Sequence, residues 1–243
     1  MEIKRYELLQ MLKKTKFLGT GGGGTAYYDP KTNKVIKIFH SFSEPILYEN
    51  YKEEDILRFN NIQTKIFIFP IEAIVVDGYA VGYICDYVKG ITLQKINLLN
   101  LNLKKFSLDV KESLPDIKKV SDHNIALYDI AYNIMFGEDG LFIIDTDDYF
   151  FSSKDNLDKL NDSIFSDSIK TFLVDNYFDE FVNSNKLLKE MYFAKDAKIN
   201  DFLDLFSEKL SEYTGSDITT LIEAIPALNK NYYEPIFIRK RIR

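Results

Sequence analysis

The sequence predicts an α+β fold of two lobes, a small antiparallel β-sheet with one helix followed by a mainly helical part. Before residue 88, short runs of β-branched and aromatic residues are separated by turn-forming residues, which is typical of short strands. After it, apolar residues recur at helical spacing, with one short β interruption. The chain has 243 residues, 46% of them hydrophobic, which is enough to bury a core.

The first lobe is expected to begin with a helix over residues 1–14, and a strand starts at Phe17. Residues 25–28 and 35–39 form the next two strands. The five residues between them, DPKTN, are rich in turn formers, so these strands pair as a hairpin.

A helix is expected over residues 46–59, because Ser43-Glu44-Pro45 is a helix-start pattern and apolar residues then recur at helical intervals. Two strands follow, at residues 71–76 and 79–87. Asp77-Gly78 joins them, and this dipeptide is preferred in tight hairpins.

In the second lobe, residues 103–120 predict a helix despite Pro115, which kinks it or starts a turn. Residues 134–136 and 141–144 predict a second hairpin. Further helical segments are expected at residues 168–182 and 199–213.

Composition argues against several classes of function. The formal net charge is −6, which disfavours nucleic-acid binding, and the basic residues 239–243 are interpreted as a solvated tail. Cys85 is the single cysteine, so no internal disulfide forms. With only His40 and His123 besides, there is no zinc-site spacing. His123 is interpreted as a structural histidine.

No membrane-targeting segment is expected. The first ten residues, MEIKRYELLQ, lack the apolar core of a signal peptide. The most apolar stretch, residues 66–76, is short and is interrupted by Pro70 and Glu72. These features predict a soluble, cytoplasmic protein without a membrane partner.

A glycine-rich loop lies between the first two strands. Gly19, Gly21 and Gly24 fit the pattern G-x-G-x-x-G, but a dinucleotide-binding fold needs a helix after the loop, and a strand is expected here. A glycine loop between two strands covers phosphates with its backbone N–H groups instead. The alternative is a flexible surface turn.

Lys37 is the candidate phosphate-binding lysine. Its neighbours Ile36 and Ile38 are apolar, so Lys37 faces the other side of the strand. The alternative is an ordinary lysine on a half-exposed strand. Glu53 is the preferred acidic partner for Lys37, ahead of Glu49 one turn away and of Glu54.

Three oxygen-bearing residues bracket the second hairpin. Asn133 and Asp145 are candidate ligands of Mg²⁺, which prefers carboxylate and amide oxygens. Asp129 is the candidate residue to accept the proton of an attacking hydroxyl. The alternative is that all three are ordinary turn residues.

In this order, these segments resemble the protein-kinase-like superfamily, which includes eukaryotic-type protein kinases and related small-molecule phosphotransferases. Five segments over roughly residues 17–150 carry the resemblance: LGTGGGGTA at 18–26 (glycine loop), VIKI at 35–38 (lysine motif), GYICDYVKG at 82–90 (hinge), YDIAYNIMF at 128–136 (catalytic loop) and FIIDTDDY at 142–149 (metal-binding segment).

The resemblance implies one kinase-like catalytic domain over residues 1–243, with lobes at 1–87 and 88–243, that binds ATP and Mg²⁺. It implies that backbone groups of Asp86 and Val88 bind adenine. The residues it assigns to the phosphates are Gly19, Gly21, Gly22, Gly24 and Lys37.

Several positions depart from the superfamily's pattern. Leu127-Tyr128-Asp129 replaces its H-R-D, and Asn133 follows Asp129 by four residues instead of five. Ala131 stands where Ser/Thr kinases have a lysine. Thr146-Asp147 replaces Phe-Gly, and Asp147 is either a second metal ligand or a turn residue. Cys85, at the gatekeeper position, is interpreted as a small buried hydrophobe.

The sequence predicts a phosphotransferase that moves the γ-phosphate of Mg-ATP to a hydroxyl on a protein. A small molecule, such as an amino sugar or another cation, is the alternative acceptor. A nucleotide-binding pseudokinase scaffold is the alternative outside the enzyme class, and the irregular catalytic loop favours it. The four retained residues Lys37, Asp129, Asn133 and Asp145 favour the enzyme.

Overall fold

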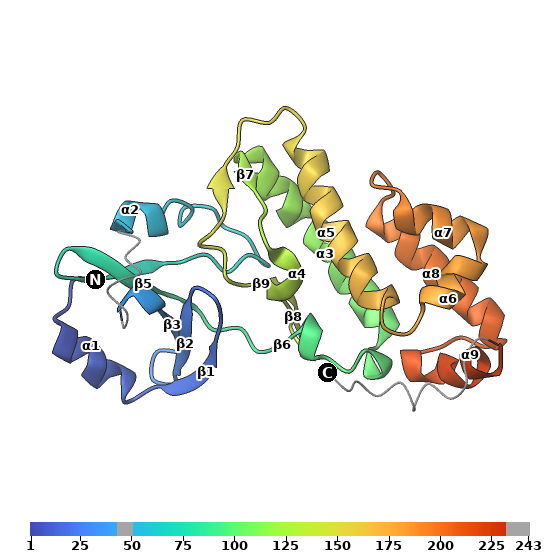
Figure 1. Ribbon diagram of the computed structural model, residues 1–243, viewed down its shortest axis with the longest axis horizontal. Helices are drawn as coiled ribbons and strands as arrows, with labels where there is room; N and C mark the ends of the chain where they lie inside the picture. Colours follow the sequence, from blue (N-terminus) through green and yellow to red (C-terminus); the bar gives the residue numbers. More distant parts are fainter. Residues whose placement is uncertain (43–50, 232–243) are drawn as a thin grey trace. The chain divides into compact units, whose positions relative to one another are not determined.

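The computed structural model describes residues 1–42 and 51–231, and the chain is α+β and divides into two compact units. The first unit contains residues 1–89 and 142–148, and the second contains residues 90–141 and 149–243. The chain therefore leaves the first unit once and returns to it for one short segment. Figure 1 labels the elements of both units. Among the described residues, no helix is long and apolar enough to cross a membrane.

The first unit is built on a five-stranded antiparallel sheet in the order β1-β2-β3-β5-β4. Both hairpins predicted for this region are present, and Asp77 and Gly78 turn between β4 and β5 with φ of 53° and 82°. Its elements are α1 (Arg5–Leu12), β1 (Lys16–Thr20), β2 (Gly24–Asp29), β3 (Lys34–Phe39), the 3₁₀ turn His40–Phe42, α2 (Glu53–Ile56), β4 (Glu72–Val76) and β5 (Tyr79–Asp86).

The two faces of the sheet carry separate apolar clusters. On one face, Ile36 and Ile38 pack with Leu8 of α1. On the other, Phe39 packs with Ile56 of α2 and with Tyr83. Successive side chains of a strand point to opposite faces, so Lys37 shares the Phe39 face.

The two predicted helices of this unit differ from the observed ones. The helix at the N-terminus begins only at Arg5, because the residues before it pair with β4: Ile3 N donates to Val75 O at 2.9 Å. The expected helix 46–59 and its start at 43–45 fall partly outside the described residues. Its described part is helical only over α2, because the backbone turns at Leu57.

The second unit is mainly helical. Two small sheets accompany the helices, with strand orders β6-β8-β9 and β7-β10, and β8 and β9 form the predicted second hairpin. The elements are β6 (Ile91–Thr92), 3₁₀ turns at Leu93–Lys95, Leu98–Asn100 and Leu221–Ala224, α3 (Leu103–Asp122), β7 (Ile125–Ala126), α4 (Ile130–Asn133), β8 (Ile134–Gly137), β9 (Gly140–Ile143, which leads into the first unit), β10 (Phe150–Phe151), α5 (Leu157–Val174), α6 (Asp179–Ser184), α7 (Lys186–Phe193), α8 (Ile199–Thr214) and α9 (Ile225–Asn231).

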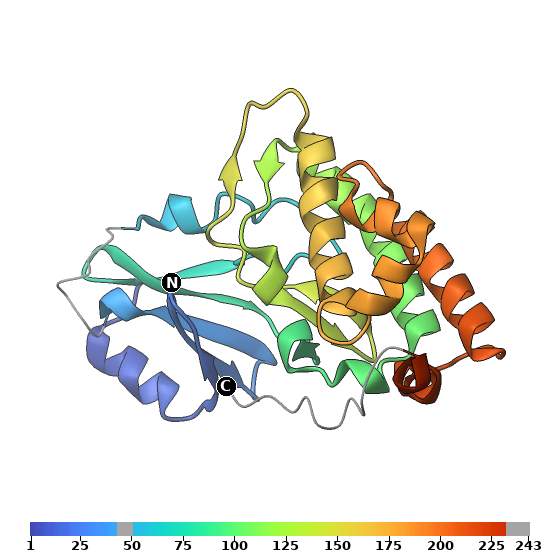
Figure 2. The ribbon, with the colours of Figure 1, turned by 45° about the vertical axis from the view of Figure 1, so that its right-hand side comes forward.

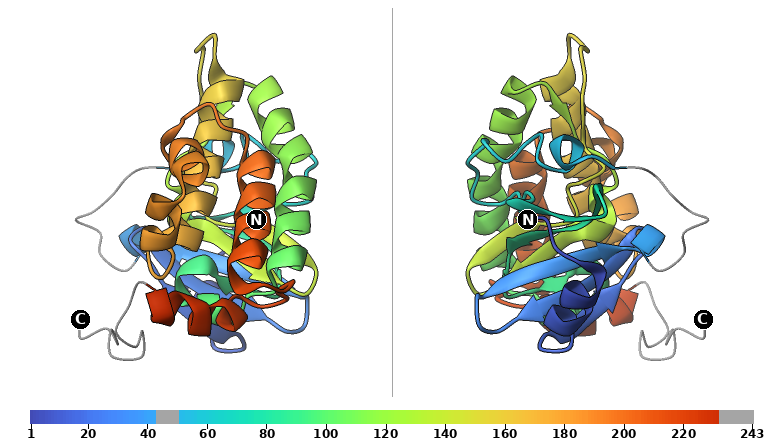
Figure 3. Two further views of the ribbon diagram at one scale, coloured as in Figure 1. Left: turned by 90° about the vertical axis from the view of Figure 1, so that its right-hand side faces the viewer. Right: turned by 90° about the vertical axis from the view of Figure 1, so that its left-hand side faces the viewer.

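Three long helices, α3, α5 and α8, pack together as the centre of the second unit (Figure 2). On α3, Phe106, Val110 and Ile117 are fully buried, which is the helical spacing of an inner face. The ring of Phe106 lies 5.6 Å from that of Phe172 on α5. Figure 3 shows α8 between α3 and the pair α6 and α7.

The expected helix 103–120 is confirmed as α3. Pro115 lies inside it on the exposed side, where the carbonyl it leaves unpaired can reach solvent. The expected helix 168–182 is instead the end of α5 and the start of α6. The chain turns between them so that Phe178 packs its ring 5.4 Å from that of Phe206. The expected helix 199–213 is confirmed as α8.

Candidate functional site

Lys37 lies on the central strand of the first unit, between Ala26 of β2 and Tyr83 of β5. It is 9% exposed. Its ammonium lies 5.9 Å from the ring centroid of Phe39 and 5.5 Å from that of Tyr83. A lysine this deeply buried is rare unless it is paired, so its partners define the site.

The partners of Lys37 are two aspartates on the segment that follows β9. Its ammonium donates to Asp145 Oδ1 and to both carboxylate oxygens of Asp147, at 3.0 and 3.1 Å. The Asp147 side chain is 12% exposed and that of Asp145 37%. Lys37, Asp145 and Asp147 all belong to the first unit, and we call them the Lys37 cluster.

Backbone pairing with residues 66–68 fixes this segment. Ile143 N donates to Ile66 O at 2.7 Å, and Ile68 N donates to Ile143 O at 2.9 Å. The buried hydroxyl of Thr146 then donates to Ile68 O at 3.1 Å. Between these anchors Asp145 has a left-handed backbone, with φ of 60°, which aspartate tolerates better than most residues. Neighbouring carboxylates of this short segment thereby reach one lysine.

Burial is the largest influence on the pKa values in the Lys37 cluster. Burial lowers the pKa of Lys37, but the negative charges of Asp147 and Asp145 raise it by more. The pKa of Lys37 therefore lies above its ordinary value. Burial raises the pKa of Asp145 to about 6; Lys37 opposes the rise and the charge of Asp147 adds to it. For Asp147, Lys37 more than offsets burial, and the pKa is lowered. At neutral pH the cluster therefore carries one ammonium and two carboxylates, a net negative charge.

The glycine loop joins β1 to β2, as expected, and two of its glycines touch β3. A Cβ added at Gly24 would lie 2.4 Å from Ile38 O, so no larger residue fits without a backbone shift. A Cβ at Gly23 would lie 3.8 Å from Lys37 Nζ, which puts the loop backbone beside the Lys37 cluster. At Gly19, Gly21 and Gly22 an added Cβ would meet no protein atom within 4 Å. Contacts within the described residues therefore do not require glycine at these three positions.

Glu53 does not pair with Lys37, so this prediction is corrected. Its carboxylate lies 3.9 Å from the N-terminal amine and its side chain is 56% exposed. Glu53 begins a single helical turn whose Ile56 packs on the sheet, whereas the prediction assumed a long helix with Glu53 inside it. Glu54 lies 3.6 Å from Lys52. Glu49 lies outside the described residues.

The end of β5 carries the residues expected to bind adenine. Asp86 is the last residue of β5, its side chain is paired with Lys34, and Val88 follows it as the chain leaves the first unit. Cys85, beside them, is buried, and burial raises the pKa of its thiol to about 12, so it is an unreactive buried residue as expected.

Asp129 and Asn133 belong to the second unit and lie together there. Asp129 precedes α4 with a left-handed backbone, φ 48°, and is exposed. The side-chain amide of Asn133 donates to the backbone carbonyl of Asp129 at 3.0 Å. The four-residue spacing is therefore accommodated by a tight turn that keeps the two residues in contact.

Asn161 of α5 anchors the chain that leads to Asp129, a role the sequence analysis missed. It is fully buried, its Oδ1 accepts from Leu127 N at 3.0 Å, and its Nδ2 donates to Ile125 O at 2.8 Å and to Ser121 Oγ at 2.9 Å. The signal in the sequence is a polar amide among the mainly apolar residues of the buried face of α5. Because buried amides need partners, such a residue indicates a fixed backbone nearby.

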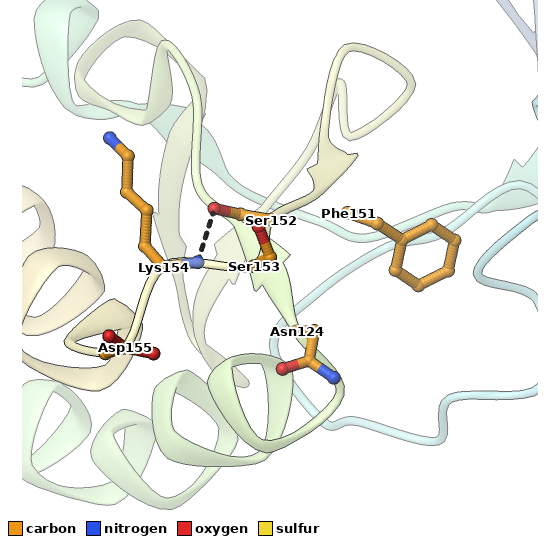
Figure 4. Close-up of a pocket in the computed structure, with 6 residues that line it drawn as sticks. All are labelled: Asn124, Phe151, Ser152, Ser153, Lys154 and Asp155. Atoms are coloured by element: carbon orange, nitrogen blue, oxygen red, sulfur yellow. Dashed lines mark hydrogen bonds between the residues drawn. The ribbon is translucent and has the colours of Figure 1, made fainter.

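An open depression of about 700 Å³ lies elsewhere on the second unit. Figure 4 shows its lining, in which Lys154 N donates to the hydroxyl of Ser152. The six residues that line it are Asn124, Phe151, Ser152, Ser153, Lys154 and Asp155. None of the predicted site residues lines this depression.

Among the described residues, no group of three or more His, Cys, Asp and Glu side chains is arranged to hold a metal ion. Magnesium in nucleotide sites is held by one or two carboxylates together with phosphate oxygens and water. The two carboxylates of Asp145 and Asp147, of which Asp145 is the more exposed, fit that donor set in chemistry. Lys37 beside them fits a phosphate.

Comparison with known proteins identifies no relative: no protein-family model matches the chain, and no curated protein matches it.

Proposed function

We propose that the chain is an ATP-dependent phosphotransferase of the protein-kinase-like fold that transfers the γ-phosphate of Mg-ATP to a protein hydroxyl. One observation carries the proposal: a buried lysine on the central strand is paired with two aspartates and lies 3.8 Å from the position of a Cβ at Gly23 in the glycine loop. A lysine, acidic side chains and glycine backbone together are what phosphate and its metal ion require.

In the proposed reaction Lys37 binds the α- and β-phosphates, and the N–H groups of the glycine loop cover them. Asn133 and Asp145 would hold the metal ion. Magnesium, when bound, supplies positive charge to the phosphate oxygens. Asp129 accepts the proton of the acceptor hydroxyl as its oxygen forms a bond to the γ-phosphorus, and the bond from that phosphorus to the β–γ bridging oxygen breaks to release ADP.

Exposed aromatic side chains support a protein acceptor. Tyr128 and Tyr132, on either side of Asp129 in the sequence, are 57% and 59% exposed, and Phe151 of the neighbouring β10 is 61% exposed. Aromatic residues are enriched at the cores of surfaces that bind proteins. The small-molecule acceptor remains the alternative within the enzyme class.

The test is transfer of labelled γ-phosphate from Mg-ATP into a native cell extract, with protein and small-molecule products separated. Asp145→Asn should abolish the label, and Asp122→Asn, at an exposed aspartate paired with Lys118, should leave it unchanged. Label in the protein fraction supports the proposal, and label in the small-molecule fraction supports the alternative acceptor. Absence of Asp145-dependent label, from folded protein that binds ATP, would identify a pseudokinase.

A further inference from the structure

We propose that Asp147 is the positioning residue for Lys37, the role that sequence analysis gave to Glu53. Asp145 is then available to bind the metal ion. This inference rests on the proposed function for its consequence, but the pairing itself is a property of the protein without a ligand. It assigns different tasks to two carboxylates that both contact one lysine.

The contacts of Asp147 are those of a fixed partner. Both of its carboxylate oxygens accept from Lys37, at 3.0 and 3.1 Å, and Oδ1 also accepts from the hydroxyl of Tyr83 at 3.0 Å. Tyr83 is itself 3% exposed and lies next to Lys37 in the sheet. Since a carboxylate accepting from an ammonium and a hydroxyl in a buried place has little freedom, Asp147 defines where the lysine can be.

The backbone of Asp147 is held as firmly as its side chain. The guanidinium of Arg58 donates to the carbonyl oxygen of Asp147 at 2.5 Å. One residue earlier, the fully buried Thr146 bonds through its hydroxyl to Ile68. Asp147 is thus tied to β3, to β5 and to the chain after α2, and all of these belong to the first unit.

Asp145 is held differently. Its contact with Lys37 is through Oδ1, and its side chain is 37% exposed, about three times as much as that of Asp147. A ligand can reach such a carboxylate without first breaking a buried hydrogen bond to a tyrosine. A metal ion on Asp147 would instead compete with Lys37 and Tyr83 for its oxygens. We therefore do not assign Asp147 as the second metal ligand that the sequence left open.

A double-mutant cycle in the ligand-free protein tests the pairing. Lys37→Met is combined with Asp147→Asn in one cycle and with Asp145→Asn in a second, and Tm is measured for every variant. Asparagine keeps the size of aspartate and removes its charge. The Tm coupling between positions 37 and 147 should be at least twice that between 37 and 145. Equal couplings, or a larger one at 145, would overturn the proposal.

Nucleotide binding, measured by calorimetry with and without Mg²⁺, tests the consequence. Asp147→Asn should weaken metal-free ATP binding about tenfold and leave the gain in affinity on adding Mg²⁺ unchanged, whereas Asp145→Asn should remove that gain. Loss of the magnesium gain in Asp147→Asn, with normal metal-free binding, would make Asp147 a metal ligand and overturn the assignment. If the wild-type protein binds no ATP, the proposed function fails, and the Tm cycle still decides the pairing.

Discussion

The imidazole Nε2 of His40 lies 2.8 Å from the carbonyl oxygen of Gly21. His40 directly follows β3, and its backbone N–H also donates to Gly23 O at 3.2 Å. The chain that leaves the lysine strand therefore holds the tip of the glycine loop through two hydrogen bonds. The loop carries four consecutive glycines, so few of its conformations are excluded by its own side chains, and the contacts from His40 add to the loop's own hydrogen bond from Gly21 N to Gly24 O at 2.9 Å.

We expect His40→Ala to loosen the glycine loop and to raise the KM for ATP by about 3- to 10-fold with kcat little changed, since one hydrogen bond contributes about 1 kcal/mol. Steady-state kinetics, or ATP binding, measures this. His123→Ala is the matched control, because His123 is an exposed histidine whose ring lies 2.8 Å from Lys119 O in its own helix. An unchanged KM for ATP in His40→Ala would contradict this prediction, because it would show that the loop keeps its conformation without the imidazole contact.

Two glycine substitutions test at which positions of the loop the packing of the protein itself requires glycine. Gly24→Ala should destabilise the protein by roughly 2 kcal/mol, because its Cβ would meet Ile38 O at 2.4 Å. Gly22→Ala should leave stability unchanged, since its Cβ meets no protein atom within 4 Å. Urea unfolding of both variants checks this. Equal stability of the two variants would contradict this prediction, because it would mean that the backbone at Gly24 shifts to accommodate the added Cβ at little cost.

Stability should depend on pH through Asp145. Burial raises its folded-state pKa from 3.8 to about 6, so the folded protein binds this proton more tightly than the unfolded chain. The contribution is therefore full below pH 3.8 and is lost as the pH rises to 6. Because the side chain is partly exposed to solvent, this contribution to the free energy of unfolding is about 1 kcal/mol. Asp145→Asn should lack this decline and be more stable than wild type at pH 7.

Unfolding at several pH values between 4 and 7 measures this decline. The charged groups facing Asp145 are Lys37 and Asp147, and Tyr83 and Cys85 lie nearby with raised pKa values, so neither of these two titrates in that range. Asp147 acts in the opposite sense at lower pH, since its lowered pKa gives stability that is lost as pH falls. A wild-type decline that persists in Asp145→Asn would contradict this assignment.

Asn161→Ala should cost roughly 3 kcal/mol of stability, because it leaves buried backbone groups of Leu127 and Ile125 without their partner. It should also lower phosphate transfer more than ATP binding, since the chain it anchors leads to Asp129. Thermal unfolding and kinetics measure the two effects. Asn183→Ala is the control, because Asn183 is an exposed asparagine whose amide donates to Asp179 O in its own helix. Equal losses in both variants would contradict the anchoring role.

Sequence patterns correctly predicted those elements that depend on interactions between residues a few positions apart. The alternation around Lys37 predicted that its side chain faces away from those of Ile36 and Ile38, and Asp77-Gly78 predicted a hairpin turn that the structure has. The spacing of apolar residues gave α8 within one residue. These features depend on neighbours within a few positions, so the sequence shows them directly.

The partners of Lys37 could not be found in this way. Asp145 and Asp147 are more than one hundred positions away, and they reach Lys37 only because residues 66–68 hold their segment beside the sheet. Glu53 was chosen because it is close in sequence and on a helix. Asn161 was missed for a similar reason: its partners lie on a loop about 35 residues earlier, and nothing in α5 itself identifies them.

The most direct test of the account is equilibrium binding of Mg-ATP to the wild-type protein and to Lys37→Met. Lys118→Met is the control, because Lys118 is an exposed lysine paired with Asp122 on α3. The account predicts saturable binding by the wild type and the control, with affinity at least 30-fold weaker in Lys37→Met. No binding by the folded wild-type protein, or equal affinity in all three, would contradict it.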